Sequence, residues 1–255
     1  MKRVLVPHLP GLDDNTVVIP KNELVHLVQV LRTREGEAIE VIDGQGGCVI
    51  AVLKKEGKKY FLEYVSPLTR SIANQVLPVI LEIGILKNDA MSLVIEKSVE
   101  LGIRRLVPVI TEHCVVKVHE TQKILVRWNK IAEQTLKQCG RLNKLEIFTP
   151  VTLKTMLQEE LQGARFWCDE TIENTKYCSL LDYEECIKQN TSLHLLIGPE
   201  GGFSEKERQS LTQCNVKSIS LGPLILRSET AVISACSVLA AMLRGRNFKP
   251  ENNKE

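Results

Sequence analysis

Two short stretches in the last quarter of the chain combine the residue types that form a ligand pocket. Residues 195–204 read Leu-Leu-Ile-Gly-Pro-Glu-Gly-Gly-Phe-Ser, and residues 221–231 read Leu-Gly-Pro-Leu-Ile-Leu-Arg-Ser-Glu-Thr-Ala. In each stretch a short apolar run ends in a glycine-rich turn. Glycine leaves backbone N–H and C=O groups open to an approaching molecule, and such groups can hydrogen-bond an adenine edge or a ribose. The pattern therefore predicts a pocket for a small polar ligand.

Two charged residues of the second stretch are candidates for chemistry. We expect Ser228 to be the N-cap of the final helix, which places Glu229 in the first turn, where the helix dipole favours a carboxylate. We also expect Arg227 to pair with Glu229 at the mouth of the pocket. A purely structural reading, with a dipole-matching glutamate and its ion-pair partner, stays open beside the catalytic one.

The first stretch does not match the common phosphate-binding loops. It lacks the G-x-G-x-x-G of dinucleotide sites and the Gly-Lys-Ser/Thr of a Walker loop. Ser204 and Glu207 have the spacing of a capping box, which predicts that a helix starts there. A plain strand-to-helix turn is the structural alternative for the glycines.

Composition excludes several other classes of protein. Apolar residues make up 44% of the 255-residue chain and aromatic residues 4%, which argues against an open platform of stacked aromatics for single strands. The net charge is +2, yet residues 104–144 hold nine Lys/Arg against three Glu, so a local phosphate-binding face or a solvated helix face is expected there. The eight cysteines and five histidines have no metal-site spacing, so we expect no metal, reduced thiols and a cytoplasmic location.

The elements that must position these residues change in character near residue 77. Residues 1–70 contain short β-branched runs and one amphipathic helix over 22–31, which predicts a small β-barrel domain. Residues 71–76 are expected to be a linker and 249–255 a loose tail. Residues 77–248 alternate strands with helices, which predicts a mostly parallel α/β sheet covered on both faces. The final helix is expected over 228–243 and is too short to span a bilayer.

With these motifs, the sequence resembles RsmE-type ribosomal RNA methyltransferases of the SPOUT class. The two stretches near the C-terminus carry the resemblance, and weaker matches extend it over nearly the whole chain: His26, Val30 to Arg32, Asp43-Gly44, Lys87, residues 96–102 and the Gln-Cys-Gly-Arg of residues 138–141. One position departs from the family pattern, because Leu224 stands where an arginine is usual. A cation at the edge of the pocket is therefore missing.

The resemblance implies a PUA-like β-barrel domain followed by an α/β domain with a SPOUT-type trefoil knot. It implies a homodimer that binds S-adenosylmethionine and methylates N3 of a uridine in small-subunit (16S-type) ribosomal RNA. The cofactor contacts would be Ile197, Gly198, Pro199, Glu200, Gly201, Gly202, Leu221, Gly222, Leu226 and Thr230. The RNA contacts would be Arg3, His26, Arg32, Lys87 and Arg141.

In the reaction so implied, Glu229 would accept the N3 proton or steer the sulfonium cation, and Arg227 would stabilise the charge on the uracil. The target base must be unpaired to expose N3. Two alternatives stay open. One is a SPOUT methyltransferase that acts on another RNA nucleotide or on transfer RNA. The other is a non-catalytic RNA-binding or ribosome-assembly factor.

Overall fold

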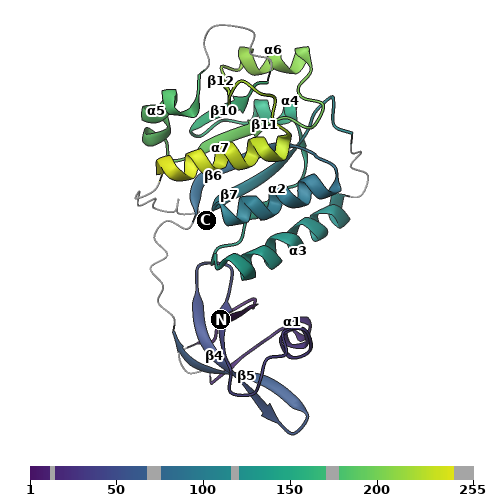
Figure 1. Cartoon of the computed structure of the whole chain (residues 1–255), viewed down its shortest axis with the longest axis vertical. Helices are drawn as coiled ribbons and strands as arrows, with labels where there is room; N and C mark the ends of the chain where they lie inside the picture. Colours follow the sequence, from purple (N-terminus) through teal and green to yellow (C-terminus); the bar gives the residue numbers. More distant parts are fainter. Residues whose placement is uncertain (12–14, 68–75, 116–120, 171–177, 244–255) are drawn as a thin grey trace. The chain divides into compact units, whose positions relative to one another are not determined.

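The computed structural model describes residues 1–11, 15–67, 76–115, 121–170 and 178–243. The chain forms two compact units (Figure 1). Unit 1 comprises residues 1–75 and 133–144, and unit 2 comprises residues 76–132 and 145–255. Most of the expected linker (residues 71–75) and the whole expected tail (residues 249–255) lie outside the described residues.

Unit 1 is built on a five-stranded mixed sheet. The strand order is β1-β3-β4-β5-β2, with β1 parallel to β3 and the other neighbours antiparallel. The small β domain expected here is confirmed, and its sheet is mixed. No pairing between described residues joins the end strands β1 and β2. The strands are β1 (Lys2–Leu5), β2 (Thr16–Val17), β3 (Ala38–Ile42), β4 (Cys48–Glu56) and β5 (Lys59–Pro67).

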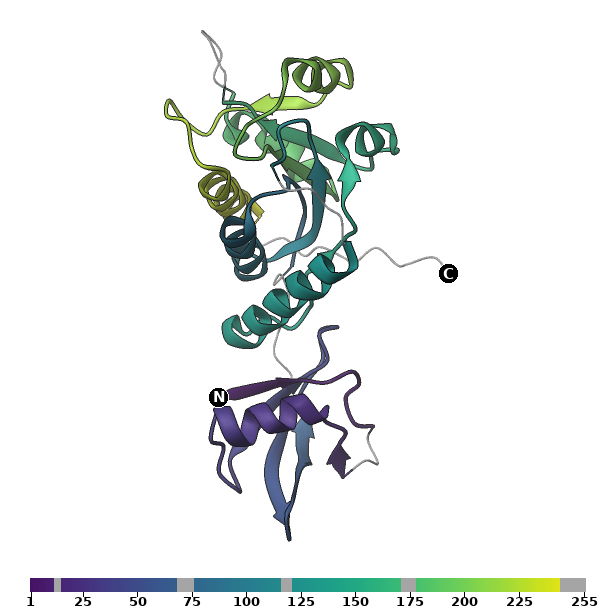
Figure 2. The ribbon, with the colours of Figure 1, turned by 90° about the vertical axis from the view of Figure 1, so that its right-hand side faces the viewer.

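The core of unit 1 lies between one face of this sheet and the helical segment of residues 21–30. The helix α1 (Lys21–Val25) continues as a π-helical turn, His26–Val30, which confirms the helix expected over 22–31 (Figure 2). Leu27 is fully buried among the inward-facing residues of the strands, and Leu24 and Val28 pack beside it. These apolar residues recur at helical spacing, and their burial fixes α1 on the sheet.

Unit 2 contains a parallel sheet of seven strands. The order is β12-β10-β11-β6-β7-β8, and β9 also pairs with β7. Every pairing within it is parallel, as the alternation of strands and helices predicts. The strands are β6 (Leu77–Gly84), β7 (Ile103–Ile110), β8 (Glu146–Ile147), β9 (Val151–Thr152), β10 (Ala164–Cys168), β11 (Leu193–Ile197) and β12 (Lys217–Ile219).

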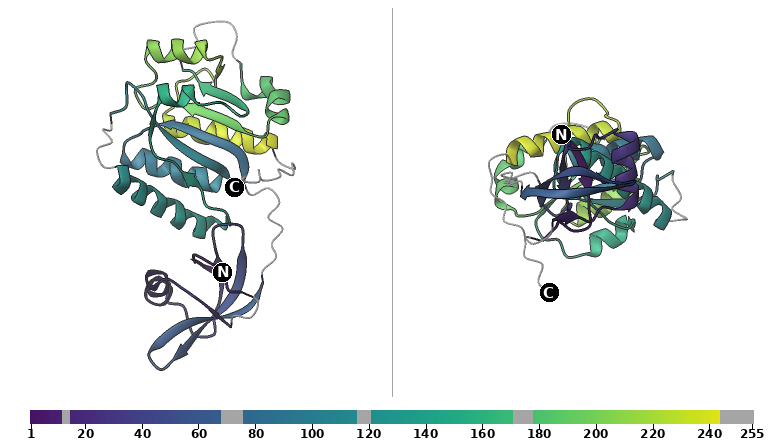
Figure 3. Two further views of the ribbon diagram at one scale, coloured as in Figure 1. Left: turned by 180° about the vertical axis from the view of Figure 1, so that it is seen from behind. Right: turned by 90° about the horizontal axis from the view of Figure 1, so that it is seen from below.

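Helices cover both faces of this sheet. On one face, α2 (Asn88–Glu100) and α7 (Ser228–Leu243) pack against each other and against β7 and β11. Seen from behind, the strands lie in front of α7, which places that helix on one side of the sheet (Figure 3). On the other face, α4 (Leu153–Gln158) and α6 (Glu205–Gln213) bury Met156 and Leu211 against Trp167 and Leu196. The sheet is thus the middle layer of a three-layer unit.

The remaining helices lie in the connections. The long helix α3 (Thr121–Cys139) contributes its first part to unit 2 and residues 133–139 to unit 1. It ends at Gly140, whose φ of +83° confirms the glycine C-cap expected there. A 3-10 turn (Leu180–Tyr183) and α5 (Glu184–Gln189) precede β11. No helix in the described part of the chain is long and apolar enough to cross a membrane.

Candidate functional site

A cavity of 590 Å³ lies at the carboxyl ends of four neighbouring strands of unit 2. Its walls come from the segments that follow β6, β10, β11 and β12: residues 87 and 90, 168–170, 197–202 apart from Gly201, and 220–229 with Ala231. In an open α/β sheet this is the edge at which ligands bind. Both glycine-rich stretches singled out in the sequence therefore reach the same place.

Most of the residues expected to hold a small ligand line this cavity. They are Ile197, Gly198, Pro199, Glu200, Gly202, Leu221, Gly222 and Leu226. Gly201 and Thr230 do not line it, and both are exposed. The two candidate catalytic residues, Arg227 and Glu229, lie on its wall, as does Lys87, which the sequence suggested as an RNA contact.

The first loop, residues 198–203, is packed closely against the end of β6 and the segment after β10. A Cβ atom on Gly84, at the end of β6, would lie 2.4 Å from the backbone nitrogen of Pro199. A Cβ on Gly202, whose φ is +66°, would lie 2.4 Å from Oε1 of Glu170. The strand-to-helix turn is thus a real reason for these glycines, in addition to any contact with a ligand.

The helix that follows the first loop starts with the expected capping box, which is confirmed. Ser204 Oγ accepts the Glu207 N–H at 3.3 Å, and Glu207 Oε2 accepts the Ser204 N–H at 2.9 Å. The second carboxylate oxygen of Glu207 accepts the Glu112 N–H, from the segment after β7, at 2.9 Å. His113 Nδ1 lies 2.9 Å from the Gly201 carbonyl oxygen. The cap therefore also ties the loop to the end of β7.

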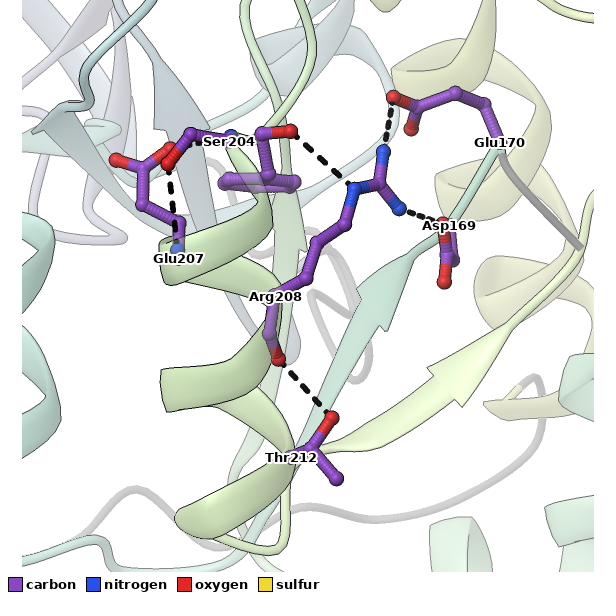
Figure 4. A network of polar contacts seen from close by, with 7 residues as sticks. Asp169, Glu170, Ser204, Glu207, Arg208 and Thr212 are labelled. Carbon is purple, nitrogen blue, oxygen red and sulfur yellow. Dashed lines mark hydrogen bonds and ion pairs between the residues drawn. The ribbon is translucent and has the colours of Figure 1, made fainter.

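Arg208 joins the first loop to the segment after β10, and sequence analysis missed it. Its guanidinium donates to the Phe203 carbonyl at 3.2 Å, to Glu170 Oε1 at 2.6 Å and to Asp169 Oδ1 (Figure 4). The guanidinium carbon also lies 5.6 Å from the centre of the Trp167 ring. Asp169 and Glu170 line the cavity, so this one side chain holds two parts of its wall together.

Glu200 has a specific partner as well. Its Oε1 accepts the backbone N–H of Lys87, the N-cap residue of α2, at 3.0 Å. A carboxylate at the N-terminal end of a helix is stabilised by the helix dipole. The side chain of Glu200 thus connects the first loop to the start of α2.

The second loop, residues 220–227, is held much less firmly. One backbone hydrogen bond ties it to a distant segment, from the Ser220 N–H to the Cys178 carbonyl at 2.8 Å. Two further hydrogen bonds are local: Gly222 N–H donates to Ser220 Oγ at 3.3 Å, and the Ser220 hydroxyl donates to the Gly222 carbonyl at 3.2 Å. Leu224 and Ile225 are 77% and 80% exposed. The residue that replaces the usual family arginine is therefore an apolar side chain in solvent.

Two local expectations for the second loop are wrong. The Ala231 N–H donates to the Arg227 carbonyl at 2.8 Å, so the helix begins at Ser228 and Arg227 takes the cap position expected for Ser228. Glu229 remains in the first turn. No ion pair or hydrogen bond between described residues joins Arg227 to Glu229, so the expected pair is not formed.

One cysteine lies on the wall of the cavity. Burial raises the pKa of the Cys168 thiol far above its ordinary value, and nearby Cys236, Glu170 and Asp169 raise it further. Burial likewise raises the pKa of Cys236, in α7, to about 12. Both thiols are therefore protonated at neutral pH, and neither is an activated nucleophile. No group of three or more metal-ligating side chains occurs among the described residues.

The structure places two of the expected RNA contacts inside unit 1, which corrects that reading. Arg3 donates to buried Glu40 at 2.5 Å and to the Lys137 carbonyl at 3.0 Å. Arg141 is 4% exposed and donates to the Asn143 carbonyl at 2.6 Å. These guanidinium groups are thus bound to protein oxygens within unit 1.

The other two candidates of unit 1 remain accessible. His26 is partly exposed. Arg32 is exposed, and its φ of +48° is uncommon for a residue with a side chain.

Comparison with known proteins decides the family. The RNA methyltransferase domain model matches residues 73–240, about two thirds of the chain, and the RNA methyltransferase PUA domain model matches residues 19–62. The chain is 31% identical over 238 residues to ribosomal RNA small subunit methyltransferase E of Buchnera aphidicola, covering 89% of this chain and 92% of that protein. The chain belongs to the RsmE family.

Solved structures agree with membership of the RsmE family. A ribosomal RNA small subunit methyltransferase E from Neisseria gonorrhoeae, crystallised with S-adenosyl methionine, is 28% identical with a TM-score of 0.80, covering 95% of this chain and 97% of that one. A methyltransferase from Legionella pneumophila, solved with SAM, is 29% identical with a TM-score of 0.80, covering 94% and 96%. The expected order of a PUA domain followed by a methyltransferase domain is therefore confirmed.

Proposed function

We propose that the protein is an S-adenosylmethionine-dependent methyltransferase that acts on N3 of a uridine in small-subunit ribosomal RNA. The observation that carries this proposal is the cavity between the two glycine-rich loops, with Arg227 and Glu229 on its wall, in a chain of the RsmE family. Relatives that bind S-adenosylmethionine in crystals support the choice of cofactor.

The cavity fits that cofactor in size and in chemistry. Its volume of 590 Å³ lies within the range of about 300–1,000 Å³ that is common for small-molecule sites. Backbone groups of the two loops suit the adenosine, while Ile197, Leu221 and Leu226 supply apolar walls. When bound, S-adenosylmethionine supplies an electrophilic methyl group on a sulfonium. The first loop would bind it in a preformed shape, because three hydrogen bonds, to the start of α2, the segment after β7 and α6, fix that loop.

We assign the two side chains of the cavity wall to the chemistry. Glu229 accepts the N3 proton of the uracil, directly or through water, or orients the sulfonium. Arg227 stabilises the negative charge that develops on O2 or O4 of the base. Both assignments need side chains that are not already bound to other protein groups. Neither Arg227 nor Glu229 has a side-chain ion pair or hydrogen bond with a described residue. The rest of the rate enhancement would come from orienting the two reactants.

RNA would be held by the basic side chains that stay accessible. Lys87 lies on the cavity wall, so we propose that it contacts the RNA next to the target base or the cofactor itself. His26 and Arg32 would contact RNA from unit 1.

We further propose a homodimer of knotted subunits in the cytoplasm. An apolar groove of 420 Å³ lies beside the cavity, where Leu181, Pro223 and Val238 are exposed. Together with Leu224 and Ile225, these residues form an apolar surface suited to a second copy of the chain. The trefoil knot follows from the family resemblance.

Mass mapping of small-subunit ribosomal RNA tests the function. We expect a strain that lacks the gene to lose one N3-methyluridine, wild-type protein to restore it, and the Glu229→Gln variant to bind cofactor normally but methylate slowly. Loss of a methyl group at another nucleotide, or in transfer RNA, would replace the proposed substrate. Failure to bind S-adenosylmethionine in a calorimetric titration would indicate a non-catalytic RNA-binding factor.

A further inference from the structure

The β4–β5 hairpin of unit 1 ends in a tight turn that carries an excess of positive charge. Glu56 pairs with Lys59, so the connection consists of Gly57 and Lys58 alone. Gly57 has a φ of +58°, which glycine adopts without strain at the first central position of a two-residue hairpin turn. Residues 54–59 contain four lysines and one glutamate, which gives this tip a net charge of +3.

The four lysines differ in how far the fold already uses them. Lys54 lies 3.3 Å from Glu63, but both side chains are more than 40% exposed, so this ion pair is weak. Lys55 lies over the Tyr60 ring, 5.4 Å from its centre. Lys58 and Lys59 are exposed, and neither ammonium has a hydrogen bond or ion pair with a described residue. Among the described residues, the ammonium groups of Lys58 and Lys59 thus have no partner, and those of Lys54 and Lys55 have weak ones.

Other cations of unit 1 show the opposite arrangement. The Lys137 ammonium binds Glu23 at 2.8 Å with both side chains about 15% exposed, and Arg3 and Arg141 bind protein oxygens. These groups stabilise the unit and have little capacity for an external anion. The hairpin lysines contribute little to stability, because they lie at the end of the sheet beyond the apolar core.

We propose that the hairpin tip, defined by Lys54, Lys55, Lys58 and Lys59, binds the phosphate backbone of the RNA substrate. This inference rests on the proposed function and adds a docking surface to it. Lysine ammonium groups are mobile point charges that suit phosphates, and displacement of condensed counterions favours binding. Such contacts position RNA without reading its sequence. The hairpin therefore supplies affinity, whereas the cavity of unit 2 selects the base.

The test compares two double variants of the full-length protein. One carries Lys58→Ala and Lys59→Ala. The matched control carries Lys154→Ala and Lys206→Ala, which removes two exposed lysines from α4 and α6 of unit 2. Binding to a small-subunit ribosomal RNA transcript is measured by fluorescence anisotropy at salt concentrations from about 0.05 to about 0.3 M. Cofactor affinity is measured by calorimetry.

The expected change follows from counterion release. The slope of log K against log salt is negative, and each lost contact to single-stranded RNA reduces its magnitude by about 0.7. The loss of two contacts should therefore reduce the magnitude by about 1.4. At about 0.1 M salt this corresponds to a loss of about fivefold for one contact and about 25-fold for two. Cofactor affinity and the melting temperature should not change. A Lys58→Arg, Lys59→Arg variant should retain wild-type binding.

Three binding results would overturn the inference. They are an unchanged salt slope in the hairpin variant, an equal loss in the control variant, and a larger loss of binding to anionic lipid vesicles than to RNA in the hairpin variant. Failure of the proposed function is separable, because it would show as absent methyl transfer by the wild-type protein. If the wild type methylates RNA and the hairpin variant does so with unchanged KM, only the docking surface is wrong.

Discussion

The two loops that enclose the cavity share a similar sequence pattern but are held in different ways. The first loop receives hydrogen bonds from the segments after β6 and β7 and from Arg208 of α6, which also binds Glu170 in the segment after β10. Apart from one backbone hydrogen bond, from the Ser220 N–H to the Cys178 carbonyl at 2.8 Å, the second loop makes local hydrogen bonds among the described residues, and two of its apolar side chains are at least 77% exposed. The first loop is therefore preorganised by the fold. The second is held mainly by its own residues.

This difference indicates how the site divides its tasks. A preformed loop loses little conformational entropy on binding, which favours affinity. A loop with exposed apolar residues becomes ordered when another molecule binds over those residues. The four predictions below test this division, from the largest expected effect to the smallest.

Gly84→Ala should damage the site most. The new Cβ would lie 2.4 Å from the Pro199 backbone nitrogen, where no flexible side chain can move away. We expect a destabilisation of at least about 3 kcal/mol, at the upper end for overpacking, and no measurable cofactor binding by calorimetry. Gly222→Ala in the second loop is the control, since only backbone strain at φ +133° opposes it. Equal losses in the two variants would contradict the contrast between the loops.

Arg208→Gln should have the next largest effect. It leaves Asp169 and Glu170 without their shared cation beside the cavity. Because charge-assisted hydrogen bonds contribute about 1.5–3 kcal/mol, we expect a loss of about 2 kcal/mol in urea unfolding and about tenfold in cofactor affinity. Arg208→Lys keeps the charge but not the planar fork, so it should recover only part of each loss. A Gln variant with wild-type affinity would show that the loop needs no such bridge.

Ser204→Ala tests the cap by itself. The change removes the hydroxyl that accepts the Glu207 N–H, while the second Glu207 oxygen still binds the Glu112 backbone. We expect about 1 kcal/mol of destabilisation in urea unfolding and a cofactor Kd within twofold of wild type. A larger loss of affinity would mean that the loop depends on the cap for its shape.

The double change Leu224→Ser and Ile225→Ser should affect subunit stability least. Both side chains are mostly in solvent, so the free energy of unfolding of the subunit should change by less than about 0.5 kcal/mol. If this loop contacts a second copy, sedimentation should show weaker self-association and calorimetry weaker cofactor binding. Unchanged association would exclude the loop from the subunit interface.

Local signals predicted several elements of the site well. The start of α6 and the Ser204–Glu207 capping box follow from polar residues three positions apart, and α7 follows from its apolar run. The glycine-rich turns at the ends of β11 and β12 were also readable, because strand and turn propensities act over a few neighbouring residues. The bounds expected for α7 are confirmed, but its cap was misplaced by one position, since Ser228 and Arg227 can each occupy the cap.

Contacts between distant residues could not be predicted in the same way. Arg208 meets Asp169 across 39 residues, and His113 meets Gly201 across 88. A glycine at the end of a strand, such as Gly84, signals a close approach but not which segment approaches. Likewise, the sequence shows that Arg3 and Arg141 are basic, but not that protein carbonyls occupy them.

By itself, the sequence determined the order of strands and helices, the two glycine-rich loops and membership of the family, because propensities, caps and motifs depend on nearby residues. Only the tertiary structure decided which charged groups are consumed inside the protein and which remain for a ligand. That choice depends on the partners that folding brings within hydrogen-bond distance, and those partners lie far away along the chain.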